Sequence, residues 1–223
     1  MQRVLEPELM EEPDQVAAYA NADFSASHNR IIEQIWSLFP GMNFAGDVLN
    51  LGCGSGDETF RFLNQFPDSK VIGIDGSTEM IARANTDLQR HPAALSSRAH
   101  FIVGYIPSEA IPKRRYVAVI SNSLVHHMHN PAAFWSAVAD HSTKGTAIFI
   151  ADLRRPISIE EVDELVKTYA DGAPEILRTD FRNSLCAAFT SDELRLQLKV
   201  AGLSELNVSE IGDRHLIASG LKA

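Results

Sequence analysis

The sequence has few cysteines, no long apolar run and no excess of positive charge. Its 223 residues include two cysteines, Cys53 and Cys186, which lie far apart and have no CxxC partner. This pair excludes a disulfide framework and a cysteine zinc site, and it fits a reducing compartment. No apolar stretch approaches the ~20 residues of a membrane span, and the N-terminus is acidic where a signal peptide would be basic. We therefore expect a soluble, cytoplasmic protein with no membrane partner.

The charge of the chain argues against nucleic acid as a partner. The formal net charge is −9 at pH 7, and a field of that sign repels phosphate backbones unless a local basic patch overcomes it. The basic runs Lys113 to Arg115 and Arg154-Arg155 are short and have no interleaved aromatic residues. With 45% hydrophobic and 22% charged residues, the composition is that of an ordinary folded domain. We expect a single domain over residues 1–223 and no nucleic-acid partner.

What the sequence does contain is an alternation of short apolar runs with amphipathic stretches. Strands are predicted over 47–51, 70–75, 100–103, 116–121 and 146–152, with helices over 58–65, 77–90 and 131–140. Strands without polar alternation, separated by helices, indicate a parallel sheet covered on both faces.

The last part of the chain has a different pattern. A capping box at Thr190 to Glu193 starts a helix that runs to Ala201 and ends at Gly202. Two weaker strands, 205–209 and 215–218, flank a turn containing Gly212-Asp213, and they should pair antiparallel at one edge of the sheet.

Two segments lie outside this alternation, residues 1–30 and residues 154–189. The second has a helical stripe of Ile159, Val162, Val166 and Tyr169. Two interpretations remain open. The segments form an N-terminal cap and a helical lid over the carboxyl ends of the strands, or they are ordinary packing helices.

A glycine-rich turn follows the first predicted strand. In VLNLGCGSG (48–56) the strand runs through Gly52, Gly54 and Gly56 into a helix, which lets the backbone approach a ligand closely. Ligands of open α/β sheets bind at the carboxyl ends of such strands. A dinucleotide fingerprint, G-x-G-x-x-G, would place its third glycine at Asp57 or Thr59, and an aspartate would repel a pyrophosphate. The spacing G-x-G-x-G argues instead for a nucleoside with an uncharged linker.

From about residue 45 to the C-terminus, the sequence resembles the class I S-adenosylmethionine-dependent methyltransferases of small molecules. VLNLGCGSG is similar to the family's first motif, VIGIDGSTEMI (71–81) to its second, FIVGYIP (101–107) to the adenine-edge segment, and YVAVISNSLVHHM (116–128) to the fourth strand and the loop facing the methyl group. The resemblance implies an α/β, Rossmann-like, doubly wound and mostly parallel seven-stranded sheet. Its order would be 3-2-1-4-5-7-6, with an antiparallel last strand and helical lid segments. The implied cofactor is S-adenosyl-L-methionine.

The resemblance also implies which residues hold the cofactor. Asp75 would bind both ribose hydroxyls and Met80 would pack on adenine. Tyr19, with Phe24, would close over the methionine end, unless both rings only pack in the core. The full expected set is Tyr19, Asn50, Gly52, Cys53, Gly54, Gly56, Asp75, Gly76, Met80, Gly104, Tyr105, Ser121 and Asn122. Two positions depart from the family, because Asn50 stands where an acidic residue is usual and Tyr105 where an aspartate often contacts adenine.

The catalytic candidates follow the fourth and fifth strands: His126, His127 and Arg154. A histidine could orient or deprotonate an acceptor, since its pKa lies near neutrality, and Arg154 could pair with a carboxylate or phosphate of an anionic acceptor. Alternatively, the histidines cap local backbone groups and the arginine pairs with nearby glutamates, Glu160, Glu161 and Glu164. No metal site is expected, because adjacent histidines should point to different faces and no carboxylate lies beside them in the sequence.

The predicted function is methyl transfer to a small molecule by direct displacement. Two alternatives remain open. One is an enzyme that binds S-adenosylmethionine but modifies the cofactor or catalyses a rearrangement, and the other is a non-catalytic partner protein that binds the cofactor. The acceptor atom does not follow from the fold, because function depends on the site.

Overall fold

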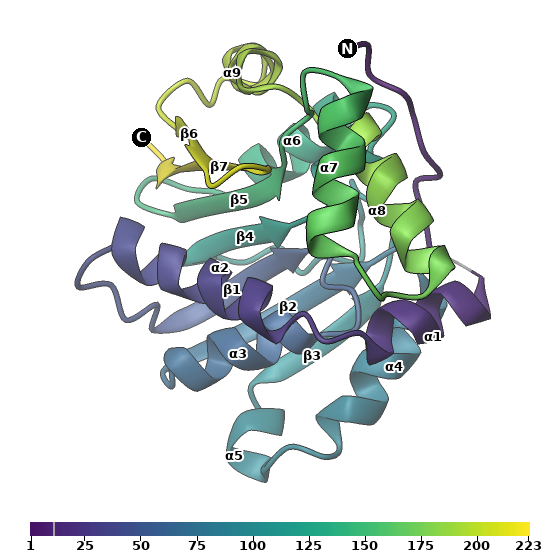
Figure 1. The fold of residues 1–223 in the computed structure, drawn as a ribbon. Helices are drawn as coiled ribbons and strands as arrows, with labels where there is room; N and C mark the ends of the chain where they lie inside the picture. The colour runs from purple at the N-terminus through teal and green to yellow at the C-terminus, as the bar shows by residue number, and fades with distance from the viewer. Residues whose placement is uncertain (11) are drawn as a thin grey trace.

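The computed structural model describes residues 1–10 and 12–223, and its strands form one seven-stranded sheet in the order β3-β2-β1-β4-β5-β7-β6 (Figure 1). The strands are β1 (Gly46–Leu51), β2 (Ser69–Asp75), β3 (Ala99–Val103), β4 (Ala118–Asn122), β5 (Ala147–Leu153), β6 (Asn207–Ile211) and β7 (His215–Leu221). All pairs among β1 to β5 are parallel, whereas β7 runs antiparallel to both β5 and β6. The predicted strand order and the antiparallel edge pair are confirmed.

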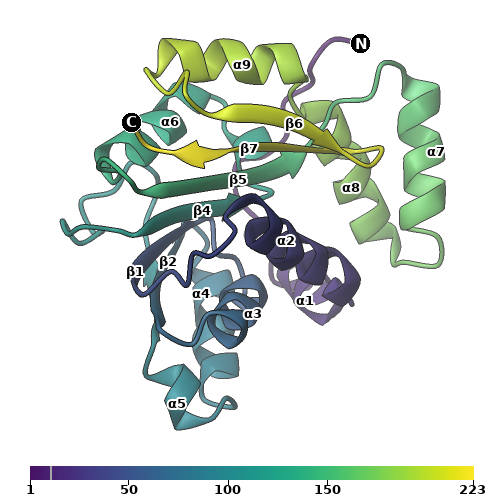
Figure 2. The same cartoon turned by 90° about the vertical axis from the view of Figure 1, so that its left-hand side faces the viewer.

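Helices cover both faces of this sheet (Figure 2). They are α1 (Pro13–Asn21), α2 (Ser25–Leu38), α3 (Asp57–Gln65), α4 (Thr78–Leu88), α5 (Ala93–Ser96), the 3-10 helix η1 (Val125–His127), α6 (Pro131–Asp140), α7 (Ile159–Tyr169), α8 (Glu175–Ala187) and α9 (Ser191–Val200). One core joins the sheet to α2, α3 and α4 through residues such as Ile35 and Phe62, and the other joins it to α6 and α9 through Trp135 and Leu198. No described helix is both long and apolar enough to span a bilayer.

Local sequence signals fix several of the helix ends. Ser77 caps α4 by accepting a hydrogen bond from the Met80 amide, so this helix begins one residue later than expected. The capping box of Thr190 and Glu193 is present at the start of α9, and Gly202 follows its end with φ of 70°. The short helix α5 had no counterpart among the predicted elements.

The segments outside the alternation lie where the chain covers the strand ends. Residues of α1, of the loop between α7 and α8, and of α8 itself line the same cavity as residues that directly follow β1, β2 and β4. The predicted stripe on α7 is only half correct. Val162 and Val166 are buried against α8 together with Leu165, but the side chains of Ile159 and Tyr169 are 42% and 46% exposed. These two residues are the first and last of the helix, and Tyr169 lines the cavity.

Candidate functional site

A cavity of about 930 Å³ lies at the carboxyl ends of the parallel strands. One group of its lining residues, which we call the cofactor wall, lies at or just after the ends of β1 to β4 and at the start of α4: Gly52, Gly54, Asp75, Gly76, Ser77, Met80, Gly104, Tyr105, Ile106, Asn122, Ser123 and Leu124. A second group, which we call the acceptor wall after the role proposed for it below, comes from η1 and its end, β5, the lid segment (residues 154–189) and the β6–β7 turn: His126, His127, Met128, Leu153, Tyr169, Leu177, Asp180, Phe181, Ser184, Arg214 and His215. Residues of α1 and α2 and of the N-terminal segment, among them Tyr19 and Phe24, complete the lining. The volume matches that of ordinary ligand sites.

Asp75, at the end of β2, is held by two backbone amides. Gly54 donates to Oδ2 at 2.8 Å and Ser77 donates to Oδ1 at 2.9 Å. Burial raises the pKa of Asp75, while these two hydrogen bonds oppose the shift. A carboxylate fixed in this way beside a cavity is a suitable acceptor for a pair of ligand hydroxyl groups.

The glycines of the loop serve different purposes. A Cβ on Gly54 would meet nothing within 4 Å, so this position opens onto the cavity. A Cβ on Gly56 would lie 2.8 Å from the Phe101 ring and 3.3 Å from Ala84. Close packing at the start of α3 therefore requires Gly56. Contrary to the expectation that it binds the cofactor, Gly56 does not line the cavity.

Most of the residues expected at the cofactor line the cavity, namely Tyr19, Gly52, Gly54, Asp75, Gly76, Met80, Gly104, Tyr105 and Asn122. Three more of the expected residues, besides Gly56, do not. Asn50 donates to the Thr59 hydroxyl at 3.0 Å, and Ser121 donates to the Leu51 carbonyl at 2.7 Å. Cys53 is buried where a Cβ on Gly73 would touch it. These side chains hold the loop and the strands together instead of facing the cavity.

The rings of Tyr19 and Phe24 lie next to each other, with centroids 4.8 Å apart and planes tilted by 39°. Burial, together with the negative charges of Glu58 and Asp75, raises the pKa of Tyr19 to about 12. The phenol is therefore neutral near pH 7 and can donate a hydrogen bond. Both rings line the cavity, so the N-terminal cap contributes aromatic surface to it.

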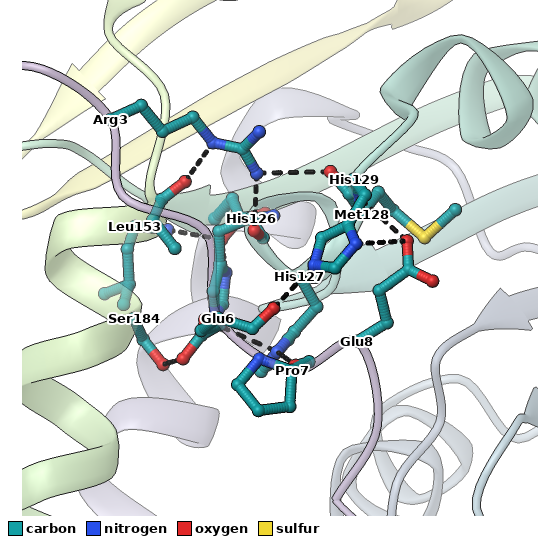
Figure 3. A network of polar contacts seen from close by, with 12 residues as sticks. Arg3, Glu6, Pro7, Glu8, His126, His127, Met128, His129, Leu153 and Ser184 are labelled. Carbon is teal, nitrogen blue, oxygen red and sulfur yellow. Dashed lines mark hydrogen bonds and ion pairs between the residues drawn. The ribbon is translucent and has the colours of Figure 1, made fainter.

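His126 lies in a buried polar cluster at the start of the acceptor wall (Figure 3). Its Nδ1 is hydrogen-bonded to the Asp152 carboxylate at the end of β5, and its Nε2 lies 3.5 Å from Oε1 of Glu6. His127 Nδ1 lies 3.4 Å from the same Glu6 oxygen. The two histidines therefore face one carboxylate, and the expectation that they diverge is wrong.

The titration of these groups follows from burial and from their pairing. Burial lowers the pKa of His126, but the Asp152 and Glu6 carboxylates outweigh it, and the net pKa is raised. Burial and the neighbouring His126 lower the pKa of His127 to about 3. Burial raises the pKa of Glu6 to about 7 against the attraction of His126.

Arg154 is not brought to the site. Its Nη2 donates to the Asp213 carbonyl at 2.7 Å, and its guanidinium lies 3.5 Å from Glu161 and 3.8 Å from Glu210. The alternative of pairing with nearby glutamates is correct for Glu161. Arg214 lies on the acceptor wall instead, with its guanidinium over the Tyr169 ring.

Several residues of the site were not expected from the sequence. Glu6 and Arg3 reach η1 from the N-terminal segment, where Arg3 donates to the carbonyls of His126 and Met128. No local pattern indicates contacts across more than a hundred residues. Ser123 has a φ of 55°, unusual for a residue other than glycine, and such backbone strain gathers at functional sites.

Comparisons with known proteins agree with this geometry. A family model described as a methyltransferase domain matches residues 48–145. An uncharacterized protein of Haemophilus influenzae is 33% identical over 129 residues, 55% of this chain and 49% of that protein. A trans-aconitate 2-methyltransferase of Deinococcus radiodurans is 32% identical over 72 residues, 32% of this chain and 26% of that protein. The chain thus spans about half or less of the length of these curated relatives.

Solved structures show the same fold at low sequence identity. The plantazolicin methyltransferase BpumL, in complex with a triazolic desmethylPZN analog and SAH, superposes with a TM-score of 0.69 at 16% identity, covering 94% of this chain and 90% of that one. A SAM-dependent methyltransferase from Aquifex aeolicus gives 0.65 at 16% identity, with 94% and 99% covered. Residues 48–145 therefore match the methyltransferase-domain family, and the chain as a whole has the fold of class I S-adenosylmethionine-dependent methyltransferases.

Proposed function

We propose that this protein transfers the methyl group of S-adenosylmethionine to a small-molecule acceptor by direct displacement, as a single domain. One observation carries the proposal. A single cavity is lined both by the glycine loop with Asp75 and by a second group of residues from the lid segment and η1. Two ligands bound side by side in one cavity are what a transfer reaction between them needs.

The residues present fit the cofactor. The Asp75 carboxylate is fixed by two amides and available to a pair of ribose hydroxyls, and Gly54 leaves the space beside it open. Met80 is buried along the same wall, where its side chain would pack on an adenine ring. We assign the methionine end to the region of Tyr19 and Phe24. When bound, the cofactor supplies a methyl group already activated by its sulfonium.

The chain's own contribution is alignment and the exclusion of water. Apolar side chains from three separate elements, Leu124, Leu153 and Phe181, line the cavity. A dry, fixed arrangement brings the acceptor atom into line with the methyl group, which provides much of the rate enhancement in a displacement.

We further propose that the acceptor is anionic and that Arg214 binds it, in the role first expected of Arg154. The guanidinium of Arg214 stacks 3.3 Å over the Tyr169 ring and pairs with Asp213 at 3.0 Å. These contacts orient a planar cation along the acceptor wall. The trans-aconitate named for the Deinococcus relative is itself an anion.

Calorimetric titration with S-adenosylmethionine, S-adenosylhomocysteine and NAD tests the cofactor. We expect micromolar binding of the first two and none of NAD. A panel of carboxylate acceptors is then screened for release of S-adenosylhomocysteine. Binding of NAD alone would overturn the assignment of the glycine loop. Cofactor binding without product release from any acceptor would favour another reaction on the same cofactor or a non-catalytic role.

A further inference from the structure

Three side chains converge at the edge of the acceptor wall: Glu6, His126 and His127. One ligand atom from each can be chosen so that all three lie within 4.8 Å of one another. Glu6 Oε1 is 3.5 Å from His126 Nε2 and 3.4 Å from His127 Nδ1. The two imidazole rings lie side by side, with centroids 4.2 Å apart and planes tilted by 35°.

These separations suit a metal ion better than direct hydrogen bonds. Hydrogen bonds between such groups are typically about 2.7–3.2 Å long. A tetrahedral zinc ion with bonds of about 2.0–2.2 Å holds its ligand atoms about 3.3–3.5 Å apart. The two distances from Glu6 Oε1, 3.5 Å and 3.4 Å, fall within the range for zinc ligands and outside the range for hydrogen bonds.

The surrounding contacts orient the donors. Asp152 engages Nδ1 of His126, which leaves Nε2 to face Glu6. A carboxylate on the far nitrogen of a histidine is a common second contact in metal sites. Ser184 donates to Oε2 of Glu6 at 3.1 Å.

The other oxygen of Glu6 supplies an independent observation. Among residues 1–10 and 12–223, Oε1 has no hydrogen-bond partner, although its side chain is only 7% exposed. A buried acceptor without a donor is costly. A cation between Oε1 and the two histidine nitrogens would remove that cost.

We propose that Glu6, His126 and His127 bind a divalent transition-metal ion, with zinc the representative ion. Two histidines and one carboxylate form the donor set of catalytic zinc sites, which keep a further position open. His127 Nδ1 also lies 3.3 Å from the Pro7 carbonyl oxygen. Metal binding would replace that contact and place the His127 proton on Nε2.

Because both histidines line the cavity, the open position of the metal faces that cavity. An oxygen of the acceptor is the fourth ligand, and the metal holds it as a Lewis acid. This last step rests on the proposed function, whereas the metal site does not.

The test is metal binding by the full chain without a histidine tag and without S-adenosylmethionine. Protein stripped with a chelator is titrated with Zn²⁺ and with Co²⁺, whose visible absorption reports four-coordinate nitrogen and oxygen ligands. Metal content is measured by mass spectrometry. We expect saturable binding of one ion per chain, lost in Glu6→Gln and in His127→Ala. Asp152→Asn should weaken it by about 10–100-fold.

The matched control is His100→Ala, which removes an exposed histidine of β3 and should bind as the unsubstituted protein does. Thermal unfolding identifies any variant that fails to fold. The isosteric Glu6→Gln keeps the test valid if His127→Ala does not fold. Absence of saturable binding, or binding that both variants retain, would overturn the metal site. Normal metal binding combined with failure of methyl transfer would count against the proposed function alone.

Discussion

The backbone amide of Gly54 donates a 2.8 Å hydrogen bond to the carboxylate of Asp75, which ties the loop after β1 to the end of β2. Because Ser77 occupies the other oxygen, the carboxylate is both a structural anchor of the loop and the proposed ribose acceptor. Each oxygen retains a lone pair for a ligand hydroxyl.

We expect Asp75→Ala to weaken S-adenosylmethionine binding by about 2 kcal/mol or more, roughly 30-fold in Kd, since two hydrogen bonds to a charged group are lost. Asp75→Asn should lose less, because its amide oxygen still accepts. The measurement is calorimetry, with Asp68→Ala as the control at an exposed aspartate outside the cavity. An unchanged dissociation constant for Asp75→Ala would remove this residue from the site.

The two later glycines of the loop should respond differently to alanine. Both have positive φ, 52° at Gly54 and 86° at Gly56, which costs an alanine about 1–2 kcal/mol. Gly56→Ala adds a steric clash with Phe101 and should lose about 3 kcal/mol or more in unfolding free energy. Gly54→Ala should lose only the backbone cost of about 1–2 kcal/mol in unfolding free energy. It should bind S-adenosylmethionine at least about tenfold more weakly. Urea unfolding and calorimetry separate the two effects, and the reverse pattern would refute the assignment.

The buried carboxyl of Glu58 should make stability depend on pH. Burial raises its pKa from 4.5 to about 7 in the folded protein, and its Oε1 has no partner among the described residues. Below pH 4.5 the group is protonated in both states and costs nothing. As pH rises toward 7 the unfolded chain ionises first, so stability is lost across this window and the loss levels off above it.

Relative to the unsubstituted protein, Glu58→Gln should therefore gain more unfolding free energy at pH 8 than at pH 4.5. The difference between the two gains should be roughly 3 kcal/mol at most. Urea unfolding of both proteins at the two pH values measures it. Glu193→Gln is a useful contrast, because pairing with Arg155 lowers the pKa of this glutamate although partial burial opposes the shift. Glu193→Gln should therefore lose more stability at pH 8 than at pH 4.5. An equal gain from Glu58→Gln at both pH values would contradict the prediction.

Acceptor binding should distinguish the two arginines. We expect Arg214→Gln to raise KM for an anionic acceptor by about tenfold or more, the loss of a charge-assisted hydrogen bond, without changing the affinity for S-adenosylmethionine. Arg154→Gln, which removes contacts to Glu161 and Asp213 outside the cavity, should leave KM unchanged. Steady-state kinetics with the acceptor found in the screen provide the measurement. A KM increase confined to Arg154→Gln would restore the first expectation.

The core of the fold could be predicted because its signals are local. Buried parallel strands give uninterrupted apolar runs, and Thr190 with Glu193 marks a helix start within four residues. The short helix α5 gave no such signal, since four residues are too few for a helical period. The helical period of α7 correctly predicted Val162 and Val166 as buried, but it did not predict the exposure at the two ends of the helix.

The candidate site could be predicted only in part, for a similar reason. Asp75 and Gly54 were found because strand ends and glycine spacing are sequence features. Ser121 follows the same strand rule but donates across to β1, a direction set by register. The carboxylate that faces Nε2 of His126 belongs to Glu6. These two residues are too far apart in the sequence for any motif spacing to predict their contact.

The two walls of the cavity differ in how far they fall within the segment that the family model matches. The segment matched by the methyltransferase-domain family, residues 48–145, supplies the cofactor wall. Much of the acceptor wall comes from the lid segment and the β6–β7 turn, which lie outside that match. Similarity over the matched segment therefore concerns the binding of the methyl donor. The part of the acceptor wall outside that segment can change in evolution without altering the cofactor wall. The match over residues 48–145 therefore supports the identity of the methyl donor more strongly than that of the acceptor.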